Sequence, residues 1–371
     1  MCIYNKNRKL NILVQVPKFN IVGQTLVVRL DNDWPNAGSH SLNKLPNEGK
    51  LDSYCDHNLA RIVVICSLYE PTHYRPNFFS EFAHSLRTHN PELVTTPLHY
   101  LVHCDAELGD TQDHSITQID SFEYTTKLIY DLSTHKHGNT TWHPYTKKLL
   151  FLPGKLRPVR YTALRELLEQ FPHELVYTLN RRLVCNIDPM HTDQRHLDWW
   201  IKNITQLYHN HPSGISAEEV IEFALAHETE PSDTDRLRMH DHTQMFSQQQ
   251  LETTSLSVIA ETVPWMTRRF FTEKTYAPIA AGRPFAHYHE LGPYLHTKGY
   301  RLFCNTKHKT QWIRDFLYQP DIEHTLDTIT HNLRTLHNNC ADTLNKIVEV
   351  FPEFGELSPQ QQINTLITFQ T

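Results

Sequence analysis

The chain has 371 residues, 39% of them hydrophobic, which is too long for one ordinary core and suits two domains of roughly 150–200 residues each. Its 35 basic and 41 acidic residues give a net charge of −6, which argues against a protein dedicated to coating nucleic acid but not against a local basic groove. The seven cysteines form no C-x-x-C pair, no apolar run approaches the ~18 residues of a membrane span, and the first residues resemble no signal peptide, so we expect a soluble cytoplasmic protein with reduced thiols.

Short apolar runs rich in Val, Ile and Leu dominate the amino-terminal part of the chain and are typical of strands that are covered on both faces. They predict strands at 11–17, 25–30, 60–68 and 99–104. Phenylalanines at helical spacing predict a helix at 77–88, which would complete a β-α-β unit. The polar segment 31–59 contains several Pro and Gly residues, and we expect a long loop that is either used at the acceptor cleft or disordered.

A polar stretch at 134–146 has the composition of a linker, so we place the domain boundary there. The predicted domains are 1–140, 141–320 and a helical segment at 321–371 that packs back across the other two. The elements expected beyond the boundary are strands at 149–152 and 174–179, and helices at 157–171, 192–209 and 216–227. Apolar residues at steps of three and four over 322–351 predict a long helix that packs along one stripe.

The segment 270–285 sets an acid and a base side by side where a helix is expected to begin, between strands at 257–260 and 283–288. Glu273 has the carboxylate that accepts both hydrogen bonds of a ribose diol, and the ammonium of Lys274 neutralises a diphosphate that a helix N-terminus also attracts. Thr272 is the expected N-cap and Gly282 the expected end of the helix. The alternative is that both charges are ordinary solvated first-turn residues.

A second cluster of charge follows the predicted strand 149–152. A tight turn at Gly154 leads into an amphipathic helix and leaves three cations around its start: Lys155, Arg157 and Arg160. Three cations in one place repel one another unless an anion joins them, which favours a diphosphate site. The alternative is a solvated basic turn. We expect this cluster and the Glu-Lys pair to converge on one activated donor.

The segment 270–285, with the Leu-Gly-Pro-Tyr-Leu and Lys-Gly-Tyr-Arg-Leu-Phe strings that follow it, resembles the carboxyl-terminal domain of glycosyltransferase-like proteins of bacteria, large viruses and phages. It also looks like the Tyr-x-Thr-Glu-Lys nucleotide-binding motif of the α1,3-fucosyltransferase family, in which the acidic and basic residues hold the ribose and phosphates of GDP-fucose. Phe270 stands where that family has its tyrosine. Residues 147–168 are similar to the segment that opens the nucleotide-binding half of the same proteins.

This resemblance, which covers about 145–182 and 255–305, implies an α/β fold of the GT-B type, with two Rossmann-like domains facing a central cleft and a long C-terminal helix. It implies an acceptor-side first domain, a nucleotide-sugar-binding second domain, and a nucleotide-diphosphate sugar as co-substrate without a metal or other cofactor. By the same resemblance Lys274 and Arg160 would stabilise the departing diphosphate, and Glu273 would hold the ribose. The remaining donor-binding residues would be Gly154, Lys155, Arg157 and Thr272.

An inverting transfer also needs a base that removes the proton of the acceptor hydroxyl. Glu70, at the end of the predicted strand 60–68, is the first candidate, and Asp105, after the strand 99–104, is the second. Each carboxylate is also explained as a loop or cap residue, and a retaining mechanism requires neither. The acceptor is either a surface or capsular glycan or a hydroxymethylated base in phage-type DNA. The DNA version predicts duplex binding through basic residues: Arg268, Arg269, Lys307 and Lys309.

Two other functions remain open. Asp31 and Asp33 form a D-x-D after a predicted strand, the arrangement with which metal-dependent GT-A transferases hold a divalent cation and a diphosphate. A non-catalytic nucleotide or nucleotide-sugar binding module would keep the Glu-Lys pair without a working base.

The 26 histidines include several i, i+2 pairs, but none has the spacing of a zinc site, so we expect no histidine-bound catalytic metal. A loop from His287 to Glu290 would face the sugar.

Overall fold

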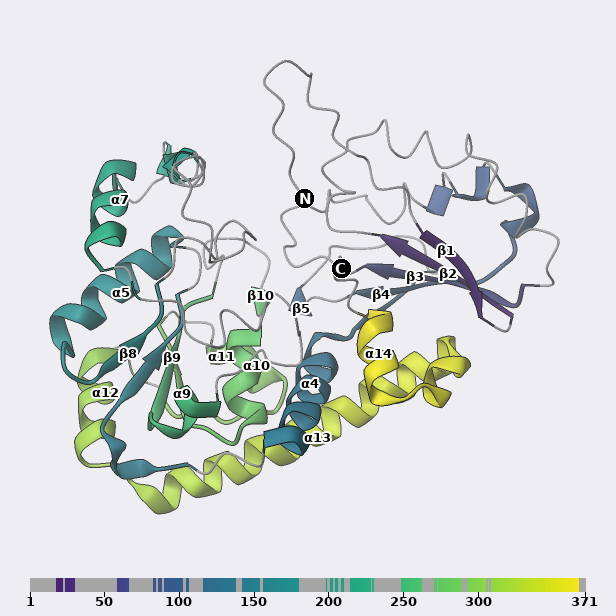
Figure 1. Ribbon diagram of the computed structural model, residues 1–371. Coiled ribbons are helices and arrows are strands. Elements are labelled where there is room, and N and C mark those ends of the chain that lie inside the picture. The colour runs from purple at the N-terminus through teal and green to yellow at the C-terminus, as the bar shows by residue number, and fades with distance from the viewer. Residues whose placement is uncertain are drawn as a thin grey trace. The chain divides into compact units, whose positions relative to one another are not determined.

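The computed structural model is a mixed α/β structure with parallel sheets and a long C-terminal helix (Figure 1). It divides into two compact units, one made of 1–121 with 343–371 and the other of 122–342, and each is described by itself. The sequence-predicted boundary at 134–146 falls inside the second unit. The residues that the structure describes are 18–22, 24–30, 59–66, 83–84, 86–88, 90–102, 105–106, 116–137, 142–153, 156–179, 198, 201–202, 204–205, 208–209, 214–227, 229, 248–261, 270–271, 273–288, 292–304, 306 and 308–366.

The first unit contains a five-stranded sheet in the order β1-β2-β3-β4-β6. Strand β1 is antiparallel to β2, and the other neighbours are parallel. The strands are β1 (Lys18–Val22), β2 (Thr25–Leu30), β3 (Arg61–Cys66), β4 (Leu98–Val102) and β6 (Ile116–Asp120). Consecutive residues of β3, Ile62 to Ile65, are all buried, as expected for a strand covered on both faces.

Three of the strands predicted for this unit are confirmed with slightly different ends, namely β2, β3 and β4. Strands β1 and β6 were not predicted. The predicted strand 11–17 and the predicted loop 31–59 lie outside the described residues, apart from Leu59 at the end of the loop. Of the predicted helix 77–88, the described residues are helical. The unit also contains η3 (Pro91–Leu93), β5 (Asp105–Ala106), η7 (Pro352–Glu356) and α14 (Pro359–Leu366).

We expect His99 on β4 to make the stability of this unit dependent on pH. Burial lowers the pKa of the His99 imidazole, Arg61 lowers it further, and Glu349 opposes the shift. As the pH drops below the ordinary histidine pKa of about 6.5, His99 therefore takes up a proton more readily in the unfolded chain than in the folded one. The free energy of unfolding is then expected to fall with the pH. When the pH is lowered from 7.5 to 5.5, the free energy of unfolding, measured by urea denaturation, should fall less in His99→Gln than in the wild type. Equal losses in the two proteins would show that His99 is not responsible.

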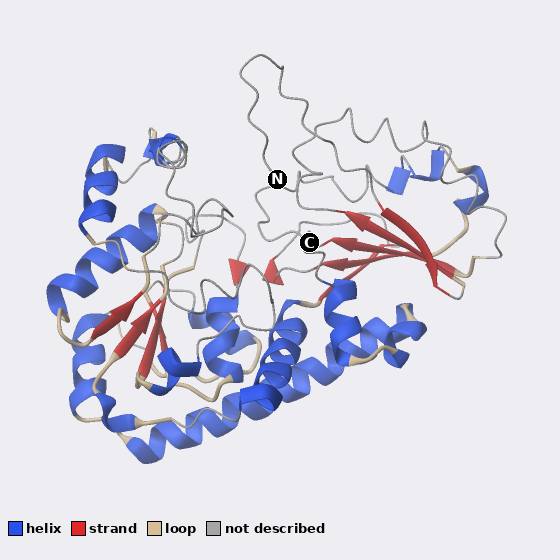
Figure 2. Ribbon diagram, viewed as in Figure 1, coloured by secondary structure: helices blue, strands red, loops and turns tan. Residues whose placement is uncertain are grey.

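The second unit contains a four-stranded parallel sheet in the order β11-β9-β7-β8. Figure 2 shows strands of this sheet in red with helices in blue around them. Its strands are β7 (Leu149–Phe151), β8 (Leu175–Tyr177), β9 (Leu256–Ile259) and β11 (Phe285–His287). In chain order the sheet starts at β7, adds β8 on one side, and then adds β9 and β11 on the other. The order of the strands therefore reverses between β7 and β9, which makes that position the topological switch point of the sheet.

Helices cover both faces of this sheet, and the alternation of side chains along β7 shows how. Leu149 and Phe151 belong to a core cluster with α5 (Pro158–Gln170), α7 (Ala217–Ala226) and α12 (Lys309–Tyr318). Leu150 faces the other way, against Leu251 of α9 (Gln248–Glu252) and against Ala281. Figure 1 shows α5 and α12 on one side of the sheet and α9 and α10 on the other. The uninterrupted apolar run of β7 is explained by this two-sided burial.

Helix α10 (Glu273–Ala280) begins directly after the predicted cap position and ends as predicted at Gly282. Gly282 has a φ of 60°, its N–H donates to the carbonyl oxygen of Ile279 at 3.0 Å, and the N–H of Arg283 donates to that of Pro278 at 2.8 Å. This pair of bonds is the Schellman ending, which requires a left-handed residue and therefore favours glycine. Strand β10 (Phe270–Phe271) precedes the helix and α11 (Gly292–Thr297) follows β11.

Four of the described helices of this unit were not predicted, namely α4 (Phe122–His137), α9, α11 and α12. Helix α4 includes the first residues of the predicted linker and packs against α10. A short 3₁₀ turn, η4 (Pro144–Thr146), completes the segment before β7. The predicted helices 157–171 and 216–227 and the predicted strand 174–179 are confirmed as α5, α7 and β8.

The predicted long helix is confirmed as α13 (Ile322–Val350). Residues on its apolar stripe, such as Leu336, Cys340 and Ile347, are buried, whereas Leu326 and Leu333 of the same stripe remain 49% and 38% exposed. No helix in the described part of the chain combines the length and the apolar character that crossing a bilayer requires.

Candidate functional site

The candidate site is the carboxyl edge of the sheet in the second unit, at the switch point between β7 and β9. In open α/β sheets, ligands bind outside the carboxyl ends of the strands where the strand order reverses. Strand β7 ends at Phe151 and is followed by the predicted basic cluster, and β9 ends at Ile259 and is followed by Ala260 and Glu261. Both segments carry buried polar side chains, which is the exception in a protein interior.

Arg160 lies in the first turn of α5 and is only 4% exposed. Its Nε donates a hydrogen bond of 3.0 Å to the carbonyl oxygen of Ala260, immediately after β9. Pro158 begins the helix, where its missing N–H costs nothing, and Arg157 precedes it in an extended conformation. The bond to Ala260 uses one of the five N–H donors of the guanidinium and fixes its positive charge at the carboxyl edge of the sheet.

The first turn of α10 is attached to the same place. The hydroxyl of Thr275 donates a hydrogen bond of 2.5 Å to Oε1 of Glu261, and the two side chains are 0% and 1% exposed. Glu273 is the first residue of the helix, and Lys274 is half-buried. Because Ala260 and Glu261 are consecutive, the starts of α5 and α10 are both fastened to the carboxyl end of β9.

The helices that carry three of the sequence-predicted donor residues, Arg160, Glu273 and Lys274, are thus both bonded to the end of β9. Arg157 is the residue that precedes α5. Asp105 is in β5 of the first unit, and its side chain and that of Glu273 are outside the described set. The predicted site residues that lie entirely outside the described residues are Glu70, Gly154, Lys155 and Thr272, together with Asp31 and Asp33 of the metal-dependent alternative.

A further polar cluster at the carboxyl end of β11 was not predicted as part of the donor site. The ammonium of Lys309, which the sequence suggested as a DNA contact, donates to the carbonyl oxygen of His287. The hydroxyl of Tyr288 donates to Oε2 of Glu166, and Thr310 donates to Oε1 of the same carboxylate at 2.7 Å. Burial and the Glu166 carboxylate raise the pKa of Tyr288, so its hydroxyl stays protonated and remains a donor. These bonds fasten α12 and α5 to the end of β11.

His287 itself lies in the core and not in a loop that faces a ligand. It is 6% exposed, and its ring stands edge-on to Phe271 and Phe285 with centroid distances of 5.8 and 5.7 Å. The other residues of the predicted 287–290 loop are Tyr288, described above, and His289 and Glu290, which are outside the described residues. Among the described residues there is no group of three His, Cys, Asp or Glu side chains that would hold a metal ion.

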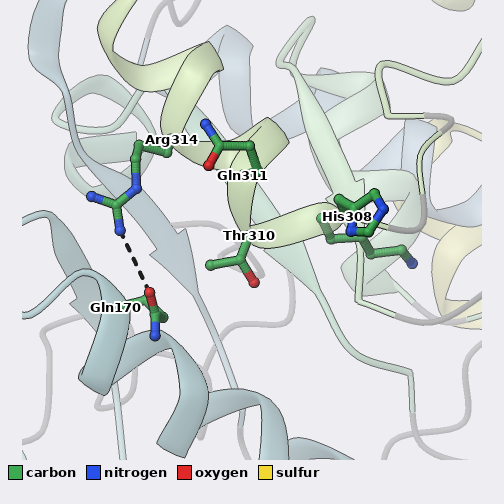
Figure 3. A pocket seen from close by; sticks show the side chains of 6 residues that line it. Gln170, His308, Thr310, Gln311 and Arg314 are labelled. Atoms are coloured by element: carbon green, nitrogen blue, oxygen red, sulfur yellow. Dashed lines mark hydrogen bonds between the residues drawn. The ribbon is translucent and has the colours of Figure 1, made fainter.

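An open pocket of about 410 Å³ lies between the end of α5 and the start of α12 (Figure 3). Arg314 and Gln170 approach each other across it with a nitrogen-to-oxygen distance of 3.5 Å, and the Arg314 guanidinium also lies 5.4 Å from the centre of the Phe171 ring. The pocket contains none of the predicted donor residues. Its lining consists of Gln170, His308, Lys309, Thr310, Gln311 and Arg314.

The chain matches no protein-family model, and it has no match among curated proteins or solved structures. The resemblance to glycosyltransferase-like proteins therefore stays a prediction made from motifs. A functional assignment must rest on the residues at the carboxyl edge of the sheet and on their chemistry.

Proposed function

We propose that the protein is a metal-independent glycosyltransferase that moves a sugar from a nucleotide-diphosphate donor to an acceptor. The observation that carries the proposal is the attachment of Arg160 and Thr275 to the neighbouring residues Ala260 and Glu261. Because of these bonds, the basic start of α5 and the Glu-Lys start of α10 lie at one switch point, where α/β sheets bind nucleotides. The parallel sheet of the second unit, and the four parallel strands of the first, are consistent with a GT-B-like architecture with two Rossmann-like domains.

In this proposal the donor diphosphate lies against the two helix starts. Arg160 and Lys274 stabilise the negative charge that develops as the bond between the sugar and the diphosphate oxygen breaks, and the oxygen leaves with the bonding electrons. Glu273 accepts hydrogen bonds from the two ribose hydroxyls. The remaining donor contacts are assigned to Gly154, Lys155, Arg157 and Thr272. A buried cation such as Arg160 is well suited to this role, because charges interact more strongly away from water.

In an inverting reaction Glu70, or alternatively Asp105, removes the proton from the acceptor hydroxyl. The acceptor is a glycan or a hydroxymethylated DNA base, and gel shifts at two salt concentrations separate these versions. Duplex binding that weakens with salt supports the DNA version, and no duplex binding even at low salt eliminates it.

We expect one of UDP, GDP and CDP, or a sugar conjugate of one of them, to raise the melting temperature of the wild type, because a ligand at one hundred times its Kd stabilises the folded state by about 2.7 kcal/mol. Lys274→Ala should lose most of this shift, because it removes the cation that faces the diphosphate. A suitable control is Lys346→Ala, which removes an exposed lysine of α13 and should keep the full shift. The measurement is a thermal-shift series on the three proteins.

If no nucleotide stabilises the wild type at millimolar concentration, the proposal fails. If a nucleotide binds at this site but no sugar is hydrolysed or transferred with any donor tested, the alternative of a non-catalytic binding module is favoured. A requirement for a divalent cation would instead favour the metal-dependent reaction through Asp31 and Asp33.

A further inference from the structure

The Lys-Gly-Tyr-Arg segment at 298–301 belongs to the second half of the glycosyltransferase-like motif, and the proposed donor site does not include it. Helix α13 holds the backbone of this segment. Asn332 accepts a hydrogen bond from the N–H of Arg301 at 2.8 Å and donates one to its carbonyl oxygen at 2.9 Å. Three more polar side chains of the helix reach carbonyl oxygens of the segment: His331, Thr335 and Asn339. Gly299, with a φ of 89°, provides the left-handed turn that presents these carbonyls.

Because its backbone is held in this way, the side chain of Lys298 has a defined direction. Its Nζ donates to the hydroxyl of Tyr276 at 3.1 Å and to Oε2 of Glu123 at 3.4 Å. The same ammonium lies 5.5 and 5.8 Å from the ring centres of Tyr276 and Tyr294, within the range of cation–π attraction. The Lys298 side chain is only 20% exposed, so a carboxylate and two aromatic rings replace much of its water shell.

Glu123, in the first turn of α4, is held as firmly as its partner. Its Oε1 accepts a hydrogen bond from the hydroxyl of Tyr300 and another from Nδ2 of Asn339 at 2.9 Å, and its side chain is 7% exposed. A carboxylate with three donors around it has little freedom to move. Lys298 therefore joins Tyr276 of α10 to a rigid cluster formed by α4, α13 and the 298–301 segment.

Tyr276 is two residues after Lys274 on α10, and Thr275 between them carries the bond to Glu261. The first turns of α10 are thus fixed by one bond to the end of β9 and by another to Lys298. We propose that Lys298 is a positioning residue that sets the orientation of α10, so that Glu273 and Lys274 face the same donor as Arg160. The inference rests on the proposed function, because it concerns the geometry of the same donor site.

The test compares Tyr276→Phe, which removes a single buried hydroxyl, with Lys298→Met and Lys298→Arg. Nucleotide Kd is measured with UDP, GDP and CDP, and amide hydrogen exchange is measured without ligand. We expect Tyr276→Phe and Lys298→Met to raise the Kd about tenfold, which corresponds to about 1.4 kcal/mol. Exchange should become faster in 274–280 but not in the strands of the sheet. Lys298→Arg keeps the positive charge and should recover most of the affinity. The control is Arg301→Met, which breaks an exposed ion pair with Asp327 and should change neither measurement.

Unchanged Kd and unchanged exchange in Tyr276→Phe would overturn the inference. Faster exchange of α10 with an unchanged Kd would also overturn it, because Lys298 would then brace the helix without positioning the donor site. A uniform rise in exchange over the whole unit would indicate general destabilisation and would count against it as well. If the wild type binds no nucleotide, the proposed function fails. Hydrogen exchange is measured without ligand and tests the role of Lys298 separately. If α10 exchanges no faster in Tyr276→Phe than in the wild type, only the role of Lys298 is rejected.

Discussion

Replacing Arg160 with methionine is expected to lower the free energy of unfolding by about 1–3 kcal/mol. Methionine keeps most of the length and the apolar character of the arginine stem, so the change removes mainly the guanidinium. The substitution removes the hydrogen bond from Nε to the carbonyl oxygen of Ala260, and this bond is buried, because Arg160 is only 4% exposed. The variant should also lose the stabilisation by nucleotide that the wild type shows, because the charge facing the diphosphate is gone.

The matched control for this substitution is Arg165→Met on the same helix. Arg165 is 53% exposed and forms ion pairs with Glu169 and Glu219 at 3.4 and 2.7 Å, and exposed pairs contribute less than about 1 kcal/mol. Urea denaturation followed by tryptophan fluorescence measures both variants. If Arg160→Met were as stable as Arg165→Met and kept the nucleotide response, Arg160 would have neither of the roles assigned to it.

Replacing Glu123 with leucine should have a larger effect on stability, about 3–5 kcal/mol. The substitution removes the acceptor from three donors at once and leaves the ammonium of Lys298 in a largely buried position without its carboxylate. The hydroxyl of Tyr300 also loses its partner. Burial and the Glu123 carboxylate raise the pKa of Tyr300, so this hydroxyl remains a neutral donor that needs an acceptor.

Asp327→Ala is the control for this second substitution. Asp327 forms an ion pair with Arg301 at 2.6 Å in the same unit, but the two side chains are 67% and 49% exposed, so its removal should cost less than about 1 kcal/mol. Chemical denaturation of both variants gives the comparison. A loss in Glu123→Leu no greater than that in Asp327→Ala would mean that the buried cluster around Glu123 contributes little to the fold.

The elements that could be predicted from sequence are those with strong local signals. Strand β7 is an uninterrupted apolar run, and α10 has a glycine at the left-handed position that ends it. Helix α13 has an apolar stripe over 29 residues. In each case the signal lies within the element itself, so no knowledge of its partners in the fold is needed.

The elements that were missed have weak local signals. Helix α12 contains a Trp, an Ile, a Phe and a Leu among charged and polar residues. Because of this mixed composition, the sequence gives no clear sign of the helix face that packs on the sheet. Helix α4 ends in polar residues, and their composition is that of a linker. The bond between Glu123 and Tyr300 joins residues 177 positions apart, and that between Arg160 and Ala260 joins residues 100 apart. No pattern in a single sequence identifies pairs of this kind.

A crystal structure of the protein with the nucleoside diphosphate that stabilises it most would show where the donor binds. We expect the diphosphate to lie between the first turns of α5 and α10, within hydrogen-bonding distance of Arg160 and Lys274, with the ribose hydroxyls on Glu273. A nucleotide bound elsewhere, with the carboxyl ends of β7 and β9 unoccupied, would contradict this expectation.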